Sequence, residues 1–70
     1  MEKKTAFWER MDFVIEDAES GATLQWVYDV ESYEDMKIYM DVVYSAKYRG
    51  IDSGCMVFKA LDATYLVWEV

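Results

Sequence analysis

The stretch ESYEDMKIYMDVVYSAKYRG, residues 31–50, carries the start and stop signals of one helix. Ser32 is suited to cap the amino terminus, with Asp35 three positions later in a box-like arrangement. Gly50 is suited to the left-handed residue that ends a helix, and two basic residues precede it. We therefore predict a helix over residues 33–49.

Apolar residues recur at helical spacing on one side of this predicted helix, which indicates that this side packs on a sheet. They are Met36, Tyr39, Met40, Val43 and Ala46. Ile38 and Val42 lie on the opposite side, one turn apart, and we predict that they form a small exposed contact strip.

Two segments before the helix alternate between apolar and polar residues, as half-buried strands do. In residues 7–17 the predicted core positions are Phe7, Met11, Phe13 and Ile15, and in residues 22–30 they are Leu24, Trp26, Tyr28 and Val30. A two-residue turn at Ser20 and Gly21 would pair Ile15 with Trp26, and a four-residue loop of the same parity is the alternative.

A second hairpin is predicted after the helix, from residues 55–60 and 64–70. Its predicted core positions are Met56, Phe58, Leu66, Trp68 and Val70. The chain is thus expected to form one α+β domain over residues 1–70. We predict a four-stranded, mainly antiparallel sheet in the order strand, strand, helix, strand, strand, with the helix packed on one face.

The chain is acidic, with 14 acidic and 7 basic residues and a formal charge of −7. This charge argues against direct binding to nucleic acid or to anionic membranes and favours a protein partner with a basic surface, although it also suits solubility alone. An apolar stretch long enough for a membrane span or a signal core is absent, and Cys55 has no second cysteine to pair with. We therefore expect a cytoplasmic protein.

The sequence offers little for catalysis, because histidine is absent. Cys55 and Lys59 would lie about 13 Å apart along a strand, too far for the lysine to activate the thiol. Asp17, Glu19 and Asp62 fit solvated turns better than a glycosidase pair or a cation site. We predict a protein that is not an enzyme and that uses no cofactor and no metal.

The outer face of the predicted sheet is more apolar than a solvated face needs to be. By parity its apolar members are Trp8, Val14, Val27, Cys55, Val57, Tyr65 and Val67. This face is predicted to contact a partner or a second copy. The alternatives are cover by amino-terminal residues, by the long stems of basic side chains or by a bulge in the first strand, or reversed parity of one strand.

Acidic residues are densest where the second strand enters the helix. They are Asp29, Glu31, Glu34 and Asp35. In the predicted register Asp12 lies opposite Asp29, and Arg10 lies opposite Glu31. The like-charged pair has no internal cation, so we expect this cluster to attract an external lysine or arginine.

These properties predict a small, acidic, non-catalytic binding protein. Small size, acidity and the lack of an active site are shared with many phage-encoded inhibitors of restriction, CRISPR and host polymerase machinery. We therefore expect a phage or mobile-element inhibitor that blocks a basic, nucleic-acid-binding host protein or enzyme. The alternative is a structural or assembly domain that forms a homodimer. The predicted contact residues are Asp12, Asp29, Glu31, Glu34, Ile38, Val42, Val57, Tyr65 and Val67.

Overall fold

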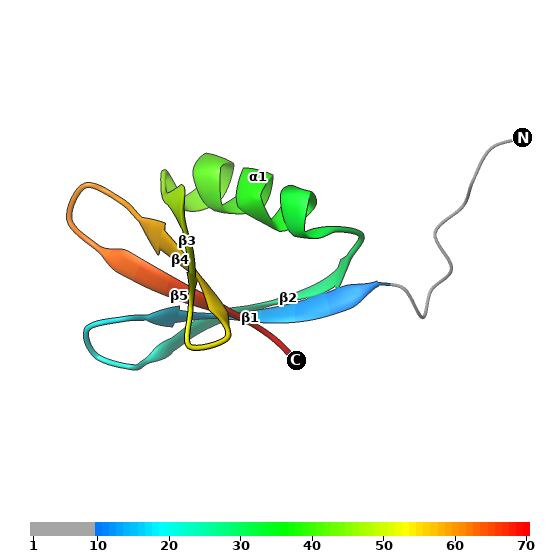
Figure 1. Ribbon diagram of the computed structural model, residues 1–70, viewed down its shortest axis with the longest axis horizontal. Helices are drawn as coiled ribbons and strands as arrows, with labels where there is room; N and C mark the ends of the chain where they lie inside the picture. The colour runs from blue at the N-terminus through cyan, green and yellow to red at the C-terminus, as the bar shows by residue number, and fades with distance from the viewer. Residues whose placement is uncertain (1–9) are drawn as a thin grey trace, which may run out of the picture.

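The computed structural model describes residues 10–70 and has one helix beside one sheet (Figure 1). In chain order the elements are β1 (Met11–Asp17), β2 (Thr23–Val30), α1 (Tyr33–Tyr44), β3 (Lys47–Asp52), β4 (Cys55–Lys59) and β5 (Thr64–Glu69). The sheet has the order β2-β1-β5-β4-β3, and each neighbouring pair is antiparallel. The predicted α+β class is confirmed, but the sheet has five strands and not four. Among the described residues, none of the helical segments has the length and apolar character that crossing a membrane requires.

The additional strand comes from the carboxyl-terminal part of the predicted helix. The start is as predicted, because the Ser32 side chain accepts a hydrogen bond from the Asp35 backbone N–H at 3.1 Å. The helix ends at Tyr44, where Ser45 takes a left-handed conformation with φ 54°. Residues 47–52 then pair with β4, so the expected cap at Gly50 is wrong. The ladder with β4 pairs backbone groups of residues 47–52, so the segment that leaves the helix at Ser45 is not left to solvent alone.

The core lies between α1 and the sheet. Its buried members are Phe13, Ile15, Val30, Met36, Met40, Ala46, Met56, Phe58 and Val67. This set confirms the predicted inner face of β1, and it includes two of the predicted positions on β4. On α1, Ile38 and Val42 are exposed as expected, whereas Val43 is half exposed and does not belong to the core. The predictions for Phe7 and Trp8 lie outside the described residues.

The predicted inner face of β2 is wrong over most of its length. Ile15 pairs with Gln25 and not with Trp26, and Phe13 pairs with Val27. The reason is two register shifts in the β1–β2 ladder, one of them a bulge at which Asp29 has φ 61°. Trp26 and Tyr28 therefore turn away from the core, and the bulge returns Val30 to it.

Gln25 occupies a helix-facing position that the alternation had assigned to solvent. Its side-chain amide donates to the Tyr39 hydroxyl and accepts a hydrogen bond of 2.7 Å from the Tyr44 hydroxyl. A polar side chain is tolerated under the helix because its hydrogen-bonding groups are satisfied there.

The predicted faces of β5 are reversed. Val67 is 1% exposed and pairs with Ile15 and Met56, while Tyr65 packs edge-on against Tyr44 at 5.0 Å between ring centroids. Val67 and Tyr65 are therefore not outer-face contacts, as the sequence had suggested. Leu66 and Trp68 lie on the outer face instead, and Val70 is exposed beyond the strand. Both faces of β5 carry large apolar side chains, so alternation alone does not decide between them.

The β1–β2 connection is the four-residue alternative and not the two-residue turn. The Asp17 backbone N–H donates to the Ala22 carbonyl at 2.9 Å, which closes the loop 18–21. The Asp17 carboxylate accepts bonds from the Ser20 N–H and hydroxyl at 3.2 and 2.8 Å. This aspartate turn, with Gly21 at φ 77°, satisfies hydrogen-bonding groups of the loop without a tight two-residue turn.

Candidate protein-binding surface

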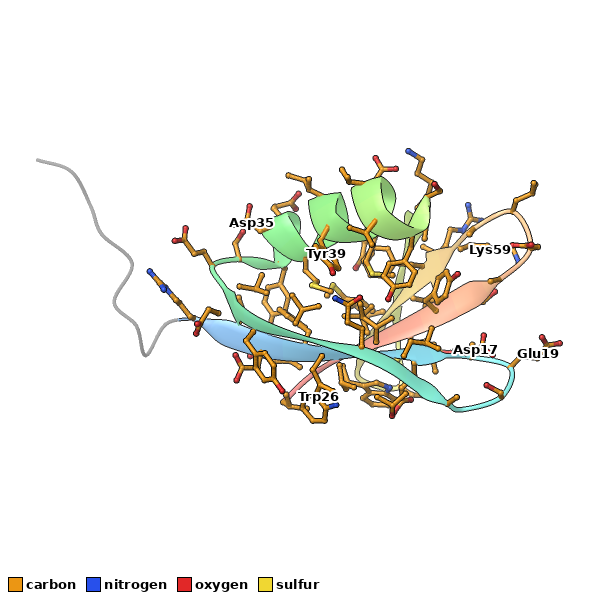
Figure 2. The ribbon with its side chains drawn as sticks, turned by 180° about the vertical axis from the view of Figure 1, so that it is seen from behind. Asp17, Glu19, Trp26, Asp35, Tyr39 and Lys59 are labelled. Carbon is orange, nitrogen blue, oxygen red and sulfur yellow. The ribbon has the colours of Figure 1, made fainter. Side chains whose placement is uncertain are left out.

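The sheet face that points away from α1 carries an apolar cluster, which we call the outer face. Its members are Val14, Trp26, Val57, Leu66 and Trp68. Figure 2 shows Trp26 on the side of the sheet opposite Tyr39 of α1. Val14 pairs with Trp26 on one side and Trp68 on the other, and it is only 7% exposed. The two indoles thus shield Val14 on a face that no helix in residues 10–70 covers.

Two aromatic side chains of β2 are presented to solvent at the edge of the outer face. Trp26 is 48% exposed and Tyr28 is 63% exposed. Their rings are stacked, with centroids 6.2 Å apart and planes 13° from parallel. Stacking restricts both side chains before any partner arrives, and tryptophan and tyrosine are the residues most often found as energetic anchors of protein interfaces.

Hydrogen bonds hold the polar groups of the outer face in place. The Trp68 indole N–H donates to the Glu16 carboxylate at 3.1 Å. The Cys55 thiol, which is almost fully buried, donates to the Asp52 carbonyl at 3.1 Å. Burial raises the pKa of this thiol, and the charges of Asp52 and Glu16 raise it further. Cys55 is therefore a structural residue and not an activated nucleophile.

The acidic residues at the entrance to α1 follow the exposed aromatic pair along the chain, and Figure 2 shows one of them, Asp35, on the helix side of the sheet, opposite Trp26. We call this group, Asp29, Glu31, Glu34 and Asp35 together with Asp12, the acidic corner. The Asp12 carboxylate accepts the Asp29 backbone N–H at 3.0 Å, so one member of the predicted like-charged pair is bound internally. Glu31 lies 3.8 Å from Arg10, and Glu34 lies 3.2 Å from Lys37. Asp29 and Asp35 make no ion pair within the described chain.

The structure brings together only part of the predicted contact set. Asp29 and Glu31 follow the aromatic pair directly along the chain, and Val57 lies on the outer face, where it pairs with Leu66. Ile38 and Val42 are exposed on α1, across the sheet from the outer face, so they do not belong to the same surface.

Sequence reasoning missed three members of the outer face, Trp26, Leu66 and Trp68, and also Tyr28 at its edge. One signal was present, since Asp29 breaks the run of β-favouring residues in β2 and aspartate is among the residues that tolerate positive φ. For β5 both alternating sets carry large apolar residues, Leu66 and Trp68 on one side against Tyr65 and Val67 on the other, so alternation gives no comparable signal.

The described residues contain no cluster of histidine, cysteine, aspartate or glutamate arranged to hold a metal ion. The chain matches no protein-family model, no curated protein and no solved structure in the comparisons made.

Proposed function

We propose that the protein binds, without catalysis, a partner protein that presents a basic surface. The observation that carries this proposal is the stacked, exposed pair of Trp26 and Tyr28, followed along the chain by Asp29 at the end of β2 and Glu31 just after it. Aromatic anchors bury apolar area at low entropic cost. The carboxylates that follow them favour lysine and arginine on the partner protein.

The charge of the surface favours a basic partner over an acidic or neutral one. Within the acidic corner, the cations in contact are Arg10 and Lys37, each paired with a single carboxylate. The chain as a whole carries −7. Complementary charge raises the rate of encounter, which is where rim carboxylates have their largest effect.

The more specific form of the proposal is an inhibitor, of the kind that phages and mobile elements use, that covers the nucleic-acid-binding surface of a host protein. The exposed aromatic residues among the carboxylates support a mixed apolar and acidic plug. They do not suit a pure charge mimic of DNA, which would need carboxylates spaced like phosphates over a long face.

A second candidate function is self-association through the outer face. The half-exposed Trp26 beside Val14 favours it, since exposed apolar surface of this kind often marks an interface. A dimer through this face would, however, bring the Asp12 and Glu16 carboxylates of both copies into one interface, where like charges repel. Sedimentation equilibrium separates the two candidates, because self-association predicts a native mass of twice 8.3 kDa.

The test uses two variants that lose the same charge from opposite ends of the sheet. One carries Asp29→Asn with Glu31→Gln in the acidic corner, and the control carries Glu19→Gln with Asp62→Asn. Figure 2 shows Glu19 at the tip of the β1–β2 hairpin, far from Asp35 of the acidic corner. Both variants keep the fold, because these side chains are exposed.

Each variant and the wild type are immobilised, and proteins retained from a host lysate are quantified by mass spectrometry. We expect basic proteins retained by the wild type to be lost from the acidic-corner variant and kept by the control. A parallel pair, Tyr28→Ser against Leu61→Ser, tests the aromatic anchor with a fully exposed leucine as control. Equal losses in each variant and its control would refute the proposal, because general charge and apolarity would then explain retention.

A further inference from the structure

A pocket of about 320 Å³ opens on the helix side of the sheet, between the start of α1 and the β3–β4 hairpin. Buried apolar side chains of the core form its floor, namely Phe13, Met56 and Val67. Tyr33, Tyr48 and Ile51, all partly exposed, form its walls. This volume is at the lower end of the range for ligand pockets, which suits one long side chain better than a cofactor.

Two charged groups stand at the rim of this pocket, and only one of them is neutralised. The Lys37 ammonium lies 3.2 Å from the Glu34 carboxylate and 4.0 Å from the centroid of the Tyr48 ring. Glu69 accepts a hydrogen bond from the Tyr33 hydroxyl, and no cation among residues 10–70 lies within ion-pair distance of it. The unbalanced charge at the rim is therefore negative.

The pocket adjoins the acidic corner, because Lys37 at its rim lies 3.2 Å from Glu34 of that group. Glu69 pairs with Phe13 across β1 and β5, one residue from Asp12. Tyr33 begins α1 directly after the loop that carries Glu31. At the rim itself, the hydrogen bond to Glu69 and the negative charge of that carboxylate raise the pKa of the Tyr33 phenol.

We propose that this pocket receives one arginine or lysine side chain of the basic partner, an inference that rests on the proposed function. The aliphatic stem packs between Ile51 and the apolar floor, and the cation meets the Glu69 carboxylate and the ring of Tyr33. The Lys37 ammonium over Tyr48 shows that an aromatic wall of this pocket already accepts a cation. Arginine suits the site best, because its planar guanidinium stacks on an aromatic ring while it pairs with a carboxylate.

The chemistry of the rim argues against an acidic occupant. Lys37 is the cation lining the pocket, and it is engaged by both Glu34 and Tyr48. An incoming carboxylate would have to displace Glu34 and would then lie close to Glu69. A cation would not have to displace Glu34, and it would be attracted to Glu69.

The experiment titrates the isotope-labelled protein with small probes and follows backbone amide signals by NMR. The probes are acetyl-arginine amide, acetyl-lysine amide, the uncharged acetyl-norleucine amide and the acidic acetyl-glutamate amide. We expect saturable shifts at Tyr33, Tyr48 and Ile51 with the two basic probes, and none with the other two.

Two charge-matched variants locate the site. Glu69→Gln keeps a side chain that accepts the Tyr33 hydrogen bond, and we expect it to weaken arginine binding by about tenfold or more, the loss that corresponds to one charge-assisted contact. Glu19→Gln removes the same charge from the far hairpin and should change binding by less than about twofold. Binding of the norleucine or glutamate probe, or an equal loss in both variants, would overturn the inference.

This test is independent of the partner. If the basic probes leave the pocket signals unchanged while lysate capture still depends on the acidic corner, the pocket inference fails and the proposed function stands. If the probes bind at the pocket and capture shows no dependence on the acidic corner, the proposed function fails and a cation-binding pocket remains.

Discussion

Replacing Val67 and Val57 by threonine, one at a time, tests which face of the sheet is the core. The substitution keeps the β-branched shape and exchanges one methyl group for a hydroxyl. Val67 is 1% exposed and pairs with Ile15 and Met56, so the new hydroxyl would be buried without an evident partner. Such burial costs about 1–3 kcal/mol. Val57 lies on the outer face and is partly exposed, so water can reach the hydroxyl there, and we expect a change within about 0.5 kcal/mol.

The free energy of unfolding is measured by urea denaturation with tryptophan fluorescence. A domain of this length is expected to have roughly 3.5–10 kcal/mol of stability, so Val67→Thr remains folded and measurable. Its melting temperature should fall by about 4–8 °C for each kcal/mol lost, and the denaturant slope should match that of the wild type. Equal losses in the two variants would refute the assignment of inner and outer faces, and with it the outer face as an open binding surface.

Two further predictions concern local features of the β1–β2 hairpin. Although valine favours strands, Asp29→Val should lower the free energy of unfolding by about 1–2 kcal/mol, because φ 61° is costly for a β-branched residue. Asp29→Gly should not lower it, and thermal melting of both variants checks this. The side-chain and backbone hydrogen bonds from Ser20 lower the pKa of Asp17, so their stabilising effect is full above the ordinary carboxyl pKa and disappears as the pH falls through the lowered value. Ser20→Ala should therefore raise the pKa of Asp17 in an NMR titration and make stability less sensitive to acid, and an unchanged Asp17 titration would contradict this account.

The parts of the fold that could be predicted rest on signals local to the chain. The Ser32 cap depends on residues three positions apart, and the inner face of β1 depends on alternation between apolar and acidic side chains. The β4–β5 hairpin was also located correctly, because turn residues bound two short apolar runs.

The parts that could not be predicted depend on contacts between distant segments. Residues 47–52 carry no strong preference, and they form β3 because β4 offers an unpaired edge. The face of β5 is decided by the fit of Val67 between Ile15 and Met56, since Leu66 and Trp68 are equally apolar. A single sequence does not indicate which of the two alternating sets of β5 side chains faces the helix.

The candidate surface was predictable only where charge defines it. Asp12, Asp29 and Glu31 were expected near one another, and the ladder pairs Met11 with Val30 in the expected register at that end. The aromatic anchor was missed because the bulge at Asp29 changes the parity of the residues before it.

The same bulge bears on how a partner would be recognised. β2 and β3 are the edge strands of the sheet, and both have irregular ladders, with two register shifts along β2 and one along β3. Bulged and twisted edges resist the addition of a strand from another chain. Recognition through backbone pairing is therefore disfavoured at both edges, which leaves side-chain contacts with the faces. The bulge that disrupts the edge also turns Trp26 and Tyr28 outward, so one backbone irregularity both blocks strand addition and creates the aromatic surface that we propose the partner contacts.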